Sequence, residues 1–413
     1  MMLTPRLGKR TLALLGSLCL FLSAIEYLIP KPLPFMRIGL ANLPLLLALG
    51  IFGAKDFFLL ALIKVLGQGI IGGTFFSPVF LFSIAGTFTS AGLMSALHNL
   101  PGNKHPSFAG IGCAGAMASN GIQLVIARFL IFGPALRYLA PPFLASGFIT
   151  GITLGIICEI FCRHSQWYAK HSGNVGGPAN NDNLHNVVPI QLQDTVTETK
   201  ISLFEKWRMQ RSNHWNSLFN AQELFITGLV LMLIFIFNRT VEIQIIHFVF
   251  FYLLAWFSGK KNNVFITLLI MASIVFIHLL APYGKVLAAI GPLHITQGSL
   301  HAGLEKAFTL GGLMMISRAF ITADLKLPGY LGSLLGESLR LLELMREKKH
   351  MFTKGNIFTN IDKMLLELET QSTGEQEKIR FKKSSRNPKG IILLSVMIFM
   401  TVAVSVIFRF YTA

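Results

Sequence analysis

The sequence predicts an all-α integral membrane protein with about 11 transmembrane helices, arranged as a bundle of six followed by a bundle of five. Amphipathic cytoplasmic helices are expected beside these spans. Charged residues make up only 13% of the 413 residues, and hydrophobic residues make up 53%. A soluble protein typically has about 25% charged residues, because a charged side chain is costly only in hydrocarbon. Apolar runs close to the length that crosses a bilayer also recur along the chain.

Six of these runs fill residues 1–162, the predicted first domain. The first run follows a basic N-terminus, and no small-residue cleavage site comes before Glu26 and Tyr27. A retained span is therefore expected rather than a signal peptide. The expected spans are residues 11–29, 38–52, 55–71, 77–97, 107–133 and 139–162.

Residues 163–220 are rich in His, Asn, Gln, Gly and Thr and have no long apolar run. This composition predicts a polar cytoplasmic linker, part disordered and part amphipathic. Residues 221–413 form the predicted second domain, in which the charged stretch 323–389 is expected to form cytoplasmic helices. The expected spans of this domain are residues 221–237, 242–257, 264–281, 300–322 and 390–408.

The charge balance fits this topology. The chain has 36 Lys and Arg residues against 19 Asp and Glu residues, a basic excess that nucleic-acid-binding proteins also show. With the N-terminus inside, however, most of the basic residues fall in cytoplasmic segments, as the positive-inside rule requires. We therefore expect a multi-pass protein of the cytoplasmic (inner) membrane with a cytoplasmic N-terminus, and no nucleic-acid partner.

Three motifs of the first domain occur in order: RIGLANLP at 37–44, GGTFFSPVFLFSIAG at 72–86 and GIGCAGAMASNGIQL at 110–124. They resemble the Gx transporter family, also labelled heptaprenyl diphosphate synthase component I, over roughly residues 10–162. That family is similar to the substrate-binding S components of energy-coupling-factor (ECF) vitamin transporters. The resemblance implies a six-helix bundle that binds a small ligand near the outer membrane face. It also implies that Ala13 and Ser17, a small-residue face of the first span, form an interface with a membrane partner.

Polar residues inside spans are costly and tend to face a cavity or a partner. Several are expected to converge in the outer half of the first bundle, with a positive charge that suits a phosphate, diphosphate or carboxylate. Two alternatives remain: the arginines can extend to lipid headgroups, and Lys64 can pair with Glu26 or Glu159. The candidate ligand-binding residues are Arg37, Asn42, Lys64, Gln68, Asn120, Gln123 and Arg128.

The second domain contains GPLHITQGSLHAGL at 291–304, a span that ends near Arg318, and a helical pattern through 331–350. This order is similar to the T component of ECF transporters over roughly residues 221–408, which implies ATPase subunits as partners at the cytoplasmic helices 331–389. The two Ala-Arg-Gly-like tripeptides of T components are absent. An apolar stripe with helical period could equally lie on the cytoplasmic leaflet. Its members are Leu331, Leu334, Leu335, Leu339, Leu342 and Met345.

Motifs for chemistry are missing from the sequence. It has no Asp-Asp pair for magnesium-dependent prenyl transfer and no phosphate-binding Walker motif. Its four cysteines lie in apolar runs without the spacing of a zinc site. We therefore expect no enzyme activity, cofactor or metal. The predicted function is a membrane transporter component that binds a small anionic or amphiphilic molecule, vitamin-, flavin- or isoprenoid-like. The alternative is a non-transporting accessory or anchor subunit of isoprenoid-quinone or flavin-linked electron-transfer enzymes.

Overall fold

The structure is a computed structural model that describes part of the chain. The described residues are almost entirely helical, with one two-stranded antiparallel hairpin, so the prediction of a helical membrane protein is confirmed. They are residues 5–28, 39–100, 106–172, 203–238, 240–260, 263–291, 293–322, 325, 328–347, 357–371 and 387–412.

The first half of the chain forms the helices that surround the candidate site. Local sequence explains several helix ends: the Ser107 hydroxyl caps α5 by accepting a hydrogen bond from the Gly110 amide at 3.2 Å, and Gly73, with φ +54°, ends α3. The elements are α1 (Pro5–Leu28), η1 (Leu40–Asn42), α2 (Leu43–Leu49), α3 (Ala54–Gly72), α4 (Pro78–His98), α5 (Phe108–Ala127), the π-helical turn η2 (Arg128–Phe132), η3 (Gly133–Ala135), α6 (Leu136–His164) and α7 (Gln166–His171).

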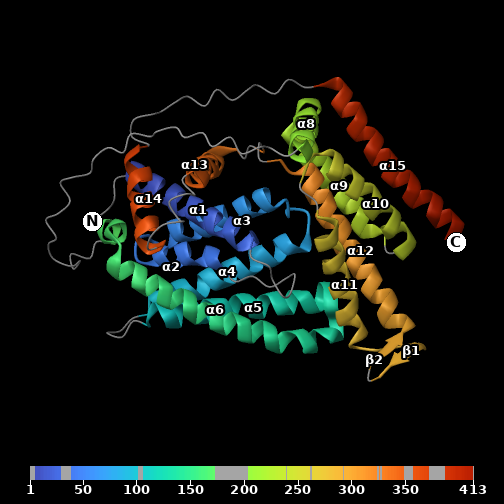
Figure 1. The fold of residues 1–413 in the computed structure, drawn as a ribbon, viewed down its shortest axis with the longest axis horizontal. Coiled ribbons are helices and arrows are strands. Elements are labelled where there is room, and N and C mark those ends of the chain that lie inside the picture. The colour runs from blue at the N-terminus through green and yellow to red at the C-terminus, as the bar shows by residue number, and fades with distance from the viewer. Residues whose placement is uncertain are drawn as a thin grey trace.

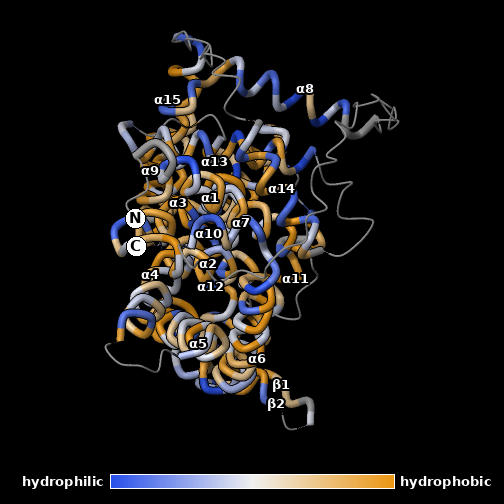
Figure 2. Tube along the Cα trace, turned by 90° about the vertical axis from the view of Figure 1, so that its left-hand side faces the viewer, coloured by the Kyte–Doolittle hydropathy of each residue, from blue (hydrophilic) through white to orange (hydrophobic). Residues whose placement is uncertain are grey.

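The second half begins with α8, which lies at one edge of the molecule and has many hydrophilic positions (Figure 2). The hairpin between α11 and α12 was not expected from the sequence, which shows only a loop pattern there. The elements are α8 (Leu203–Leu218), α9 (Ala221–Phe237), α10 (Val241–Phe257), α11 (Val264–Leu279), β1 (Val286–Ile290), β2 (Leu293–Thr296), α12 (Gln297–Phe320), α13 (Gly329–Glu347), α14 (Ile357–Gln371) and α15 (Pro388–Thr412).

Each expected span falls on helix, but helix length and composition support fewer crossings than the sequence predicted. Among the described residues, four helices are long and apolar enough to span a membrane, or five if α8 and α9, bent by 92°, count as one. The helical segment Leu40–Leu49 is too short to cross by itself. Helix α3 is long enough but contains Lys55, Asp56 and Lys64. The count of about 11 spans is therefore not established.

The two halves do not stand side by side as parallel bundles. Helices α5 and α6 run along the long axis of the molecule, whereas α9, α10 and α12 cross that axis steeply (Figure 1). In the perpendicular view, α5 and α6 are seen nearly end-on (Figure 2). Within the described part of the chain, the halves are instead joined at several places, each of which combines residues far apart in sequence.

The first junction packs α13 along α1. Gly16 makes the close approach possible, because a Cβ atom there would lie 2.7 Å from the Ser338 hydroxyl oxygen of α13. The predicted interface residues Ala13 and Ser17 are both fully buried beside it on α1. The apolar stripe of α13, including Leu334 and Leu342, is buried in the same core. In this structure, therefore, the stripe packs on the first half of the chain and not on a membrane surface.

The second junction is the loop between α3 and α4, which contains the GGTFF part of the second motif. Phe76 is 4% exposed and belongs to the core of the second half. Its amide donates to the Ser317 hydroxyl at 3.2 Å, and its ring lies against Gly228, where a Cβ would be 2.5 Å away. The loop thus inserts a phenylalanine between α9 and α12.

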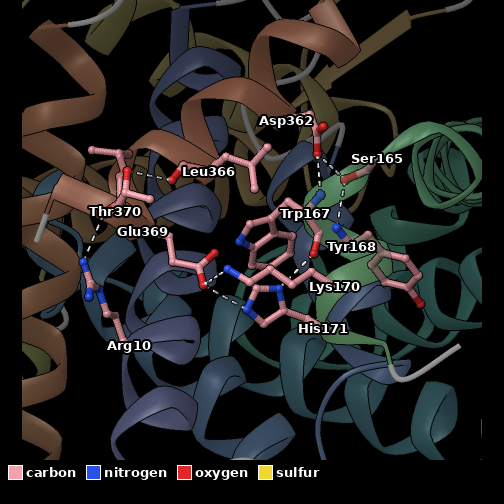
Figure 3. Close-up of polar contacts among 11 residues, drawn as sticks. Arg10, Ser165, Trp167, Tyr168, Lys170, His171, Asp362, Leu366, Glu369 and Thr370 are labelled. Carbon is pink, nitrogen blue, oxygen red and sulfur yellow. Dashed lines mark hydrogen bonds and ion pairs between the residues drawn. The ribbon is translucent and has the colours of Figure 1, made fainter. Parts of the chain in front are cut away.

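The third junction places α14 against α7 (Figure 3). The Asp362 carboxylate accepts hydrogen bonds from the Ser165 hydroxyl and from the amides of Gln166 and Trp167, each amide at 3.1 Å. Further along α14, Glu369 contacts Lys170 at 3.0 Å. An acidic side chain at a helix N-terminus pairs with its unsatisfied amides, so Asp362 caps a helix of the other half.

Candidate functional site

A cavity with about 660 Å³ of empty space, part of it open, lies among the helices of the first half. Its walls come from the end of α1, η1, α2, α3, α4, α5 and α6. Five of the seven candidate residues line it: Asn42, Lys64, Gln68, Asn120 and Gln123.

Lys64 and Glu26 are oppositely charged residues in the cavity wall. Lys64 is 4% exposed, and its Nζ donates to the Asn42 Oδ1 and, at 3.5 Å, to the Thr87 hydroxyl. Glu26 is 5% exposed and accepts a hydrogen bond from the Gly39 amide at 3.1 Å. This bond connects the end of α1 to the start of η1. Both groups are thus held in place by the chain, as a pre-formed site requires.

Three amide side chains complete the polar wall. The Ser83 hydroxyl donates to Gln68 Oε1 at 3.5 Å, Asn120 Nδ2 donates to the Phe143 carbonyl at 2.9 Å, and Gln123 Nε2 donates to the Ser119 hydroxyl at 2.9 Å. Amide side chains can both donate and accept hydrogen bonds, which makes this wall suited to a polar ligand group.

Glycines of the facing helices make room for two of the amides. A Cβ at Gly147 would lie 2.2 Å from Asn120 Nδ2, and a Cβ at Gly86 would lie 2.3 Å from Gln123 Nε2. At these positions the structure shows that the glycines face polar cavity residues.

The positive charge expected from the sequence does not converge on the cavity. Arg128 is exposed at the first residue of η2 and does not line the cavity, and Arg37 lies outside the described residues. Arg137 is exposed and packs over its neighbour Tyr138. Arg128 directly follows α5, and its amide still donates to the Leu124 carbonyl, so the π-helical turn shifts only the helix face of the residues after it. Glu159, one suggested partner of Lys64, instead pairs with Arg163 at 2.6 Å.

Sequence reasoning missed the hydroxyl groups of the cavity wall. Ser83 and Thr87 are four residues apart on α4, Ser119 precedes Asn120, and Thr150 lines the wall from α6. The i, i+4 spacing of Ser83 and Thr87 within an apolar span was a usable signal, although hydroxyls in membrane helices often bond only their own backbone. Among the described residues, no group of three His, Cys, Asp or Glu side chains is placed to hold a metal ion.

Comparison with known proteins matches two separate parts of the chain. Residues 15–161 match the family described as heptaprenyl diphosphate synthase component I. Residues 223–323 match a domain of unknown function, DUF8519. The first match begins within α1 and ends within α6, and it includes every residue that lines the cavity. The second covers α9 to α12 and does not support the expected likeness to T components. No curated protein and no solved structure matches the chain.

Proposed function

We propose that this protein is a membrane transporter component whose first half binds a small acidic or amphiphilic molecule in the cavity around Lys64. The observation that supports the proposal most is the convergence of residues from α2, α3 and α5 on one cavity. Lys64 is the one cationic side chain among the described cavity-lining residues, so an acidic ligand group would bind there in exchange for its contacts with Asn42 and Thr87. The Glu26 carboxylate on the same cavity wall would disfavour a ligand with several negative charges.

The second half would act as the scaffold of this transporter. The buried contact between α13 and the small residues of α1 supports this role, as does the insertion of Phe76. Energy for transport against a gradient would come from separate ATPase subunits, since the chain has no Walker motif. They would contact the face of α13 that carries the exposed residues Glu337, Glu343 and Arg346. In this proposal the chain itself has no enzyme activity.

The alternative is a non-transporting accessory subunit that anchors isoprenoid-quinone or flavin-linked enzymes in the membrane. Two observations favour this accessory role. The matching family is named as a component of heptaprenyl diphosphate synthase, and the Ala-Arg-Gly tripeptides of T components are missing. Affinity purification from native membranes separates the two roles, because paired ATPases support transport and a redox enzyme or prenyl synthase supports the accessory role.

The ligand proposal is tested by extracting the purified full-length protein and identifying bound small molecules by mass spectrometry. Lys64→Met should reduce the amount of the bound compound more than tenfold, because it removes the cationic group and keeps the apolar stem. Lys306→Met is the matched control, since Lys306 lies on α12 outside the cavity, close to its neighbour Glu305. A compound retained equally by both variants, or no retained compound, would overturn the proposal.

A further inference from the structure

A second cavity lies beside the first and differs from it in chemistry. It contains about 500 Å³ of empty space between α4, α5, η2 and α6. Its wall is apolar apart from Ser83 and Gln123, and includes Phe82, Leu124 and Phe143. Such a wall offers dispersion contacts and burial to a hydrocarbon group, but few hydrogen-bond partners.

The two cavities meet at Ser83 and Gln123, which line both of them. Ser83 and Thr87 lie on successive turns of α4, and Thr87 is a hydrogen-bond partner of Lys64. Four residues of helix correspond to about 6 Å. A molecule with its polar end at Lys64 would therefore reach the apolar cavity within about one helical turn.

We propose that the ligand is an amphiphile with an acidic head beside Lys64 and an unbranched or branched hydrocarbon chain in the cavity lined by Phe82, Leu124 and Phe143. This inference deepens the proposed function and rests on the first cavity being a ligand site. A purely polar ligand would make no use of the apolar cavity, whereas a hydrocarbon chain there would be removed from water.

The far wall of the apolar cavity belongs to the contact between the two halves. Phe132 lines the cavity from η2, and its ring lies 5.9 Å from the His278 ring of α11. His278 also contacts the Ile131 carbonyl through Nε2 at 3.0 Å. A chain in this cavity would thus rest against residues that the second half holds, so chain binding and contact between the halves are expected to depend on each other.

The test uses dodecanoic acid with a diazirine at its methyl end, applied to the full chain in lipid nanodiscs. After illumination, mass spectrometry should map labelled peptides to residues 124–143. Leu124→Trp, which fills the cavity, should reduce this labelling more than tenfold, and Lys64→Met should reduce it by a similar factor. Ile149→Trp is the matched control, because Ile149 is 63% exposed on α6 and lines neither cavity. Ala127→Leu is a milder filling variant if Leu124→Trp does not fold.

The outcomes separate this inference from the proposed function. The inference is supported if the cavity-filling variant and Lys64→Met each abolish the labelling, because the head and the chain then occupy adjoining cavities. Labelling that Lys64→Met leaves unchanged overturns the inference, because the head is then elsewhere. If residues 124–143 are unlabelled while a co-extracted compound still depends on Lys64, the inference fails and the proposed function stands. If neither dependence is seen, both fail. Dodecanol with the same diazirine should label residues 124–143 much less, since it lacks the acidic group.

Discussion

Replacing Asp362 tests how firmly α14 is fixed to the first half of the chain (Figure 3). The carboxylate is 9% exposed and accepts the Ser165 hydroxyl and two backbone amides of the first turn of α7. Asp362→Ala removes both carboxylate oxygens and, with them, all three hydrogen bonds. The hydroxyl and the amides then lose their partner in a place where water has little access.

The expected loss follows from the number and kind of these bonds. Removing a helix-capping acceptor costs about 0.5–2 kcal/mol, and each buried group left unpaired costs about 1–3 kcal/mol. Because the short α7 can adjust and water can reach part of it, we expect a total of about 2–4 kcal/mol for opening this junction. Since 1.36 kcal/mol corresponds to tenfold, this is an increase of about 30- to 1,000-fold in the local opening equilibrium.

Hydrogen exchange of the purified protein, read at the amides of Gln166 and Trp167, measures this opening directly. Asp362→Ala should speed exchange of both amides by that factor, and Asp362→Asn, which keeps one acceptor oxygen, should have a smaller effect. Lys363→Ala is the matched control, because Lys363 is the exposed neighbour on the same helix. If exchange at both amides changes by less than about threefold in Asp362→Ala, α14 does not hold α7 and the reasoning fails.

Three further substitutions test the other junctions and the cavity. Gly16→Leu should lower the unfolding free energy by about 1–3 kcal/mol or separate α13 from α1, because its Cβ would lie 2.7 Å from a hydroxyl oxygen of α13. Thermal unfolding checks this, and an unchanged melting temperature would contradict it. Phe76→Ala should cost about 3–5 kcal/mol in the same assay, whereas Phe129→Ala, at an 80% exposed position, should cost little; equal effects would argue against the inserted loop. Gly86→Ala should lower the co-extracted compound at least tenfold, since its Cβ would lie 2.3 Å from a cavity amide, while Gly92→Ala, with nothing within 4 Å, should not; equal retention would exclude a ligand there.

The sequence was sufficient for the helices, because apolar runs and their caps depend on local residues. Each expected span falls mainly on helix, and the side chains of Asn220 and Asn263 cap α9 and α11. It was insufficient for the hairpin of β1 and β2, whose strands are only five and four residues long and so leave little apolar periodicity to detect.

Much of the cavity wall could also be predicted, for a physical reason. Lys64, Gln68 and Asn120 are polar groups in apolar helices, and such groups must face a partner or a cavity, whatever the details of the fold. Arg128 followed the same rule from sequence but is exposed in the structure. An arginine at the end of a helix can extend to the surface, and the sequence pattern does not distinguish that position from one in a cavity.

The sequence by itself determined that this protein is a helical membrane protein, and it determined which polar residues of the first half are exceptional. Only the tertiary structure decided that the halves cross instead of lying parallel, that Asp362 caps a helix nearly two hundred residues away in the chain, and that Ser83 and Gln123 join a polar cavity to an apolar one. The reason is that periodicity and composition report which face of one helix avoids lipid or water. Which other helix covers that face depends on steric fit, at positions such as Gly16 and Gly86, between segments that are distant in the sequence.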